Sequence, residues 1–226
     1  MTARRPRGTQ AGPPARGPVP PDWLVARLRP AAAELGLDPS AVLPDAVAEP
    51  LSIYATLLLS WGQRVNLTGA GSRETLVDEH LADALAILPH LPAGSFSAID
   101  VGSGGGLPGA VLSILRPDSG WVLLEPIQKR WAFLNQVRRE VGAAARLRCV
   151  RGRLEDHVRP PGGYDVAVSR AVWPAEDWLA RARPLLSRSG CAIGLQTADP
   201  APLPAGVRRC PYRLAGRERE LLLLGS

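Results

Sequence analysis

The residues from Ile99 to Gly109 read IDVGSGGGLPG, a short apolar run that contains an aspartate and leads into five glycines within eight positions. Glycine allows positive φ angles and lets a ligand approach the backbone closely. The stretch 104–109 satisfies GxGxxG, a pattern typical of turns that bind nucleotide-containing cofactors. Glycine-rich turns that bind nothing also satisfy it, so the neighbouring residues must decide what this loop binds.

Two carboxylates stand at the ends of neighbouring apolar runs. Asp100 comes just before the glycines, where a negative charge suits the cationic amino group or sulfonium of S-adenosylmethionine and repels a pyrophosphate. Glu125 ends the next apolar run and is placed to accept hydrogen bonds from ribose hydroxyls, a feature shared with NAD binders. These residues favour S-adenosylmethionine, and an NAD(P) oxidoreductase is the alternative.

A second group of residues lies where a substrate would sit. Ser169 and Arg170 end the run GYDVAVSR, across the expected crevice from the cofactor. The planar fork of an arginine can hold a phosphate, a carboxylate or the O6/N7 edge of guanine. A surface arginine paired with an acid of the following helix is the simpler alternative. Leu154 and Glu155 either border an adenine or only begin an acidic helix.

His80 and Asp83 are three residues apart, so on a helix they share one face. They could meet the cofactor pocket, although His80 also fits the apolar stripe of its segment as a core histidine. The three cysteines and three histidines are scattered and form no CxxC pair. We therefore expect neither a disulfide framework nor a metal site.

The elements that must position these residues alternate between strands and helices after residue 92. This order predicts an α/β fold with a Rossmann-like parallel sheet and right-handed crossovers. A C-terminal hairpin would add an antiparallel strand, as in class I S-adenosylmethionine-dependent methyltransferases. Strands are expected at 96–101, 121–124, 147–150, 164–169, 191–196, 207–214 and 218–224, and helices at 108–115, 127–141 and 175–186.

Three regions follow from the patterning. Residues 1–21 are rich in proline, glycine and arginine and are expected to be a disordered basic tail, residues 22–92 a helical subdomain with helix starts near Ser40 and Ser72, and residues 93–226 the methyltransferase domain. Four of the six net positive charges come from arginines in residues 1–20, which hold no acid. The rest of the chain is only mildly basic.

The chain is expected to be a cytoplasmic monomer. It contains no apolar run near the ~20 residues that cross a bilayer, and no apolar signal core follows the arginines of its first residues. No association with a membrane is therefore expected.

Several motifs of the sequence resemble those of one known family in their order and spacing. They lie between about Ala48 and Leu195 and are similar to those of the RsmG (GidB) family of 16S ribosomal RNA methyltransferases. The motifs are Asn66-Leu67-Thr68, His80-Leu81-Ala82-Asp83, IDVGSGGGLPG at 99–109, Leu124-Glu125, Lys129-Arg130 with Phe133-Leu134, and Ser169-Arg170-Ala171.

The resemblance implies methyl transfer from S-adenosylmethionine to N7 of one guanine in 16S rRNA of the small ribosomal subunit. Because N7 carries a lone pair and no proton, this reaction needs no general base, and Arg170 is expected to be a positioning residue. By motif and resemblance together, the cofactor-binding residues are Asp100, Gly102, Gly104, Leu107, Glu125, Leu154, Glu155 and Arg170, and the substrate-binding candidates are His80, Asp83 and Ser169.

The sequence departs from the family pattern at two places. Ala84 stands where the family has serine, and Pro126-Ile127 follow Glu125 where small or polar residues are expected. The first change removes a hydrogen-bonding group, and the second alters how the next helix begins. A methyltransferase acting on another substrate and a non-catalytic RNA-binding assembly factor of the same fold remain alternatives.

Overall fold

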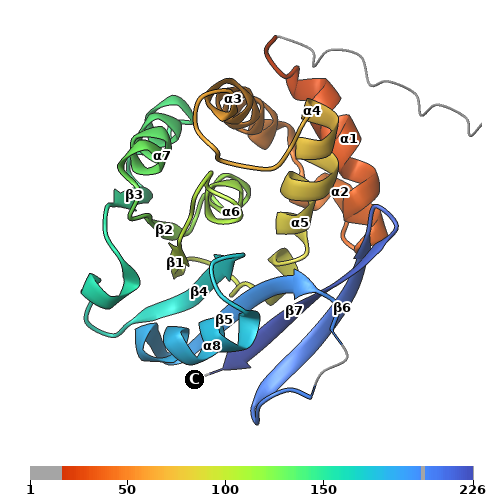
Figure 1. The fold of residues 1–226 in the computed structure, drawn as a ribbon. Helices are drawn as coiled ribbons and strands as arrows, with labels where there is room; N and C mark the ends of the chain where they lie inside the picture. Colours follow the sequence, from red (N-terminus) through yellow and green to blue (C-terminus); the bar gives the residue numbers. More distant parts are fainter. Residues whose placement is uncertain (1–16, 200–201, 226) are drawn as a thin grey trace, which may run out of the picture.

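A computed structural model describes residues 17–199 and 202–225 of the protein, which fold around one sheet. Seven strands lie in the order β3-β2-β1-β4-β5-β7-β6 (Figure 1). The first five are parallel to one another, and β7 runs antiparallel to both β5 and β6. The strands are β1 (Ser97–Val101), β2 (Gly120–Leu124), β3 (Leu147–Val150), β4 (Tyr164–Arg170), β5 (Leu186–Thr197), β6 (Val207–Leu214) and β7 (Arg217–Gly225). The predicted sheet with a terminal antiparallel hairpin is confirmed.

The helices cover the two faces of the sheet unequally. On one face lie α6 (Gly109–Leu115) and α7 (Gln128–Glu140), with α3 (Asp45–Gly62) packed over both (Figure 1). On the other face α8 (Ala175–Ala182) packs against β4, β5 and β7. Residues 151–163, which join β3 to β4, contain one short 3-10 turn, η3 (Leu154–Asp156), so no helix from this connection covers β2 and β3.

The side chains of β1 alternate between these faces. Ala98 joins the core under α6 and α7, whereas Ile99 and Val101 join the core under α8. Because side chains of a strand alternate, Asp100 points to the same face as Ala98, toward α6. This orientation determines what Asp100 can contact.

The N-terminal helices share a core with the sheet. Buried side chains of α1 (Pro21–Glu34), α3 and α5 (Ala82–Leu85) form one cluster with those of α6 and α7. Residues 22–92 therefore form an additional layer of the domain. The shorter elements of this layer are α2 (Pro39–Val42), α4 (Arg73–Thr75), the π-helix η1 (Leu76–Leu81) and the 3-10 helix η2 (Leu88–His90).

The predicted boundaries differ from the structure at several elements. Residues 1–16 of the expected tail lie outside the described residues. Val19 is fully buried and its amide donates to Thr56 Oγ1 at 2.9 Å, so the last residues of the range 1–21 belong to the folded domain instead. The predicted helix 175–186 ends at Ala182 and continues as the 3-10 turn η4 (Arg183–Leu185). Strand β5 begins at Leu186, earlier than predicted, because Leu186 already pairs with Tyr164 of β4. The register then shifts, and Cys191 is the next residue of β5 that pairs with β4, opposite Val166.

Helix starts were predicted near two serines. Ser72 is the N-cap of α4, and its Oγ accepts from Thr75 N at 3.0 Å, as expected. At the other position, Asp38 is the cap, and its carboxylate accepts from Ser40 N at 2.9 Å. The first helix of this pair therefore begins one residue before Ser40, at Pro39.

Candidate functional site

The glycine loop connects β1 to α6 and is tied to β2. The amides of Gly102 and Ser103 both donate to the carbonyl of Leu124, at 2.8 and 3.1 Å. Gly102 has a φ of +71°, and a Cβ added there would lie 2.4 Å from Cγ2 of Val172. Only glycine adopts this positive φ without strain and has no Cβ to clash with Val172, which explains why the loop has no side chain at this position.

Asp100 supports this loop from beneath. Its Oδ2 accepts from the amide of Gly109 at 2.9 Å, and the residue is only 1% exposed. Burial is the main cause that raises the pKa of this carboxyl to about 7. The residue was expected to meet the cofactor's cation, but its side chain faces α6 and does not line the cavity described below. Asp100 therefore acts on that cavity through the loop.

Glu125 connects the loop to the segment before α7. Its Oε2 accepts from the amide of Gly104 at 2.9 Å, and its Oε1 accepts from the amide of Ile127 at 2.8 Å. Each oxygen keeps a second lone pair for a ligand hydroxyl. The side chain is 2% exposed and lines the cavity, so its geometry is fixed before a ligand arrives.

A cavity of about 590 Å³ lies at the carboxyl ends of β1 and β2. This volume is in the range of small-molecule and cofactor sites. Four predicted cofactor-binding residues line it together, namely Gly102, Glu125, Leu154 and Glu155, and Arg130, Val172 and Trp173 add to the wall. Pro126 and Ile127, the departures from the family pattern, also line it. We refer to this space as the first cavity.

A second cavity, of about 470 Å³, lies beyond the end of β4. Ala171 lines the second cavity and Val172, the next residue, lines the first, so the two cavities lie side by side. Arg170 lines the second cavity, and its Nη1 lies 3.6 Å from Asp83 Oδ2 and 3.4 Å from His80 Nδ1. The predicted substrate candidates His80 and Asp83 thus meet Arg170, and the alternative, a pairing of Arg170 with an acid of the following helix α8, is not observed.

Asp83 is the centre of the charged network in the second cavity. Its side chain is 6% exposed, and Oδ1 lies 2.9 Å from Arg219 Nη1 and accepts from the Tyr212 hydroxyl at 2.5 Å. Burial and then the neighbouring carboxylate raise the pKa of Tyr212. Burial and then Arg170 lower the pKa of His80, so this imidazole is mostly neutral near pH 7. Together these contacts fix the guanidinium of Arg170.

Besides Asp100, three predicted site residues lie away from both cavities. Ser169 is 3% exposed and its hydroxyl donates to Val101 O at 2.8 Å, which links β4 to β1. Leu107 is 5% exposed and packs in the core beneath the loop. Gly104 contributes its amide to Glu125 and does not line the first cavity. These residues support the site without facing a ligand.

Sequence reasoning missed the residues that the terminal hairpin brings to the second cavity. Tyr212 lies on β6, and Arg217, Glu218 and Arg219 lie on β7. No motif marks them, and the Tyr212–Asp83 contact spans 129 positions of sequence. Only the insertion of β7 next to β5 shows that they belong to the site.

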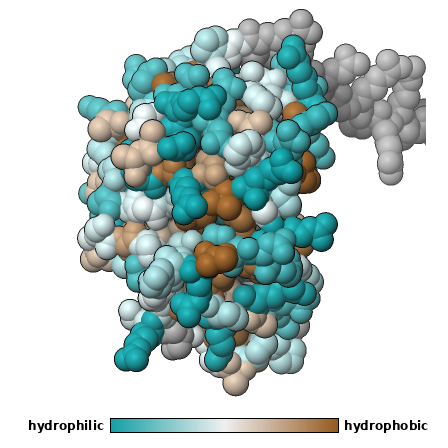
Figure 2. All heavy atoms as spheres, turned by 90° about the vertical axis from the view of Figure 1, so that its left-hand side faces the viewer, coloured by the Kyte–Doolittle hydropathy of each residue, from teal (hydrophilic) through white to brown (hydrophobic). Residues whose placement is uncertain are grey.

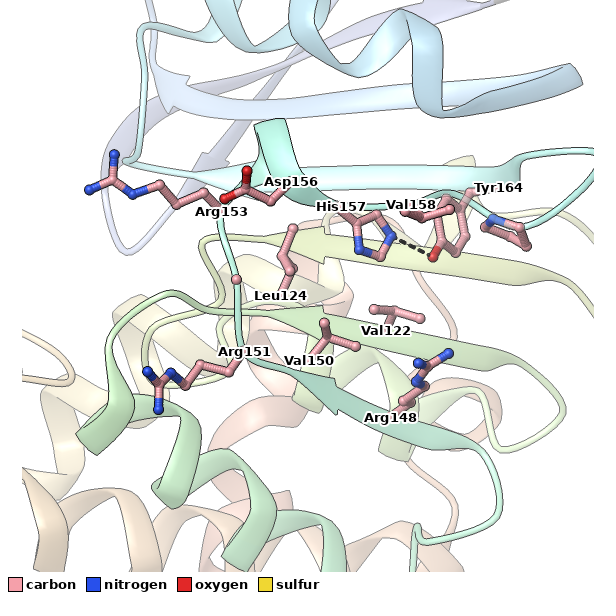
Figure 3. Close-up of a pocket in the computed structure, with 12 residues that line it drawn as sticks. Val122, Leu124, Arg148, Val150, Arg151, Arg153, Asp156, His157, Val158 and Tyr164 are labelled. Atoms are coloured by element: carbon pink, nitrogen blue, oxygen red, sulfur yellow. Dashed lines mark hydrogen bonds between the residues drawn. The ribbon is translucent and has the colours of Figure 1, made fainter.

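A further hollow lies over the face of β2 and β3 that no helix from residues 151–163 covers (Figure 3). Val122 and Val150 lie on its floor, and His157 Nε2 is 3.0 Å from the Tyr164 hydroxyl beside them. The glycine loop does not line this hollow.

Figure 2 shows that apolar side chains are grouped at the middle of one face of the molecule and are bordered by hydrophilic ones.

The sheet order, the glycine loop after β1 and the acidic end of β2 define a class I S-adenosylmethionine-dependent methyltransferase. The crystal structure of TrmN from Thermus thermophilus has a similar fold, with a TM-score of 0.50 and 19% identity over 65% of this chain and 48% of that chain. Among the described residues, no helix is long and apolar enough to cross a membrane.

The particular family follows from sequence comparison. The family profile described as rRNA small subunit methyltransferase G (GidB) matches residues 47–201. The ribosomal RNA small subunit methyltransferase G of Aromatoleum aromaticum is 37% identical over 205 residues, which cover 85% of this chain and 94% of that protein. The protein of the same name from Methylobacillus flagellatus is 37% identical over 74% of this chain and 78% of its own length. The chain therefore belongs to this family.

Proposed function

We propose that the protein transfers a methyl group from S-adenosylmethionine to N7 of one guanine in the 16S rRNA of the small ribosomal subunit. The observation that carries the proposal is the adjacency of two cavities, one beside the glycine loop at the ends of β1 and β2 and one around Arg170 at the end of β4. Family membership supplies the class of substrate. A cytoplasmic site of action follows from that substrate.

The first cavity suits S-adenosylmethionine, which supplies an electrophilic methyl group when bound. The free lone pairs of Glu125 would accept from the ribose hydroxyls, and the side chain of Leu154 would border the adenine. Gly102 lines this cavity, and its backbone would lie beside the chain that carries the sulfonium. Because the Glu125 carboxylate is already held by two amides, binding does not have to order it.

The second cavity suits a nucleobase more than a phosphate group. Its wall carries arginines and carboxylates together: the cationic side is Arg170, Arg217 and Arg219, and the anionic side is Glu79, Asp83 and Glu218. Such a balanced wall does not favour a dianion, and it accommodates a base that becomes cationic during the reaction. Arg170 would donate to O6 of the guanine.

The residues then have to position the base and exclude water. The N7 lone pair forms the new N–C bond while the methyl–sulfur bond breaks and its electron pair stays on sulfur. No proton is lost from N7, so no residue has to act as a general base. Holding both reactants in line is the main contribution that the chain makes.

The test is methyl transfer from labelled S-adenosylmethionine to small ribosomal subunits from cells that lack this modification. The product is mapped by chemical cleavage at 7-methylguanosine. We expect label at one guanine with the wild-type protein and with the control Gly62→Asp, since nothing lies within 4 Å of that glycine's added Cβ. Gly102→Asp should abolish the label. Cofactor binding without label on subunits or on free rRNA would instead support a different substrate or an assembly factor.

A further inference from the structure

Glu79 differs from the other two carboxylates that line the second cavity. Asp83 is already engaged by Tyr212, Arg219 and Arg170. Glu218 is exposed, and no described residue forms a hydrogen bond or ion pair with its side chain. Glu79 combines features of both: a contact with Arg217 orients its side chain, and its carboxylate can still accept further hydrogen bonds.

The orientation of Glu79 comes from the hairpin and from the π-helix. Its Oε2 lies 2.9 Å from Arg217 Nη1, and its backbone carbonyl accepts from Arg219 Nη1 at 3.5 Å. None of the described residues donates to its Oε1. The six-residue π-helix η1 carries both Glu79 and His80, and such widened turns often occur at functional sites.

The order of residues along the cavity sets how a guanine would lie in it. Ala171 is next to the first cavity, Arg170 comes next, His80 contacts Arg170, and Glu79 is one residue further along η1. The N7 edge of a base that accepts the methyl group must face the first cavity. Its Watson–Crick edge, on the other side of the purine, then faces η1 and the hairpin.

We propose that Glu79 selects guanine by accepting hydrogen bonds from N1–H and N2–H of the target base, an inference that rests on the proposed function. Guanine is the purine with donors at both of these positions. Adenine presents a lone pair at N1, which a carboxylate repels. Arg217 then acts as a positioning residue, because it holds one oxygen of Glu79 and thereby aims the other.

An ordinary ion pair between Glu79 and Arg217 would predict something different. The side chain of Arg217 is 64% exposed and that of Glu79 is 29% exposed, and pairs of this kind contribute little to stability. Loss of such a pair would leave base selectivity unchanged. Selectivity is therefore the readout that separates recognition from a structural role.

The experiment replaces the target guanine, once mapped, by inosine in rRNA that is reassembled into small subunits. Inosine lacks only the N2 amino group. The quantity measured is the ratio of kcat/KM on guanine to kcat/KM on inosine, for wild type, Glu79→Ala and the control Glu140→Ala. Glu140 is an exposed glutamate at the end of α7 that lines neither cavity. The affinity of each variant for S-adenosylmethionine, measured by calorimetry, shows that its first cavity is intact.

We expect wild type to prefer guanine about tenfold to a hundredfold, as for loss of a hydrogen bond to a charged group. Glu140→Ala should keep this ratio, and Glu79→Ala should bring it close to one. Equal rates on guanine and inosine with wild type, or an unchanged ratio in Glu79→Ala, would overturn the inference while methylation of guanine still supports the proposed function. Absence of any methylated guanine with wild type would reject both.

Discussion

Replacing Asp100 by asparagine tests whether the buried carboxyl beneath the glycine loop is protonated in the folded protein. Its Oδ2 accepts from Gly109 N, and no described residue donates to its buried Oδ1. Burial raises the pKa of the carboxyl from 3.8 to about 7. Asparagine keeps the shape and the acceptor for Gly109 but does not titrate, so the variant isolates the effect of the proton.

The sign of the expected effect follows from linkage. The folded protein keeps the Asp100 proton in a pH range where the unfolded chain has lost it, so stability is full below pH 3.8 and falls as pH rises to about 7. Between pH 5 and pH 8 this loss is about 2–3 kcal/mol. For a chain of this size it corresponds to a melting temperature lower by about 5–10 °C.

The assay is thermal unfolding of ligand-free wild type and Asp100→Asn at pH 5 and pH 8, followed by circular dichroism. The melting temperature of wild type minus that of the variant should be lower at pH 8 than at pH 5 by about 5–10 °C. Asp118→Asn is the control, because hydrogen bonding to Arg116 lowers the pKa of Asp118, so that group does not titrate between pH 5 and pH 8. A wild-type-minus-variant difference that is the same at both pH values would refute the reasoning.

Three further substitutions test the loop, the ribose contact and the charged network. Gly102→Ala places a Cβ 2.4 Å from Cγ2 of Val172 at a φ of +71°, so the Kd for S-adenosylmethionine should rise at least about tenfold, and Val172→Ala in the same chain should restore part of the affinity, both by calorimetry. Glu125→Gln turns an amide N–H2 toward one of two backbone N–H groups, and the same titration should show a Kd higher by about 10–100-fold. Tyr212→Phe removes a hydrogen bond to Asp83 and should lower the melting temperature by about 2–6 °C, whereas an unchanged value would mean that the contact contributes nothing.

The predicted site residues that come together at the first cavity are those whose position depends on the backbone. Gly102 and Glu125 both line it, because glycine is required at a tight turn and a strand end has a fixed place in a parallel sheet. Asp100, Leu107 and Ser169 lie on the same motifs, yet their side chains point into the protein. In strands buried on both faces, the hydrophobic pattern does not reveal which way a polar side chain points.

The hairpin residues could not have been predicted from the sequence. Arg219 and Asp83 meet only because β7 inserts between β5 and β6, and strand order is set by tertiary packing. The charge pattern of β7 reads locally as an exposed strand end. The predicted hairpin was correct, but what it does for the second cavity required the topology.

The position of β7 also determines when the second cavity can form during synthesis. β7 follows all the other strands along the chain, and β6 pairs with no other described strand. Until β7 emerges from the ribosome, β6 has nothing to pair with and Asp83 lacks Arg219. The contact between them closes a loop of well over a hundred residues, and such long-range pairing is slow. A nascent chain can therefore complete the first cavity before the second, which forms only in a single late step.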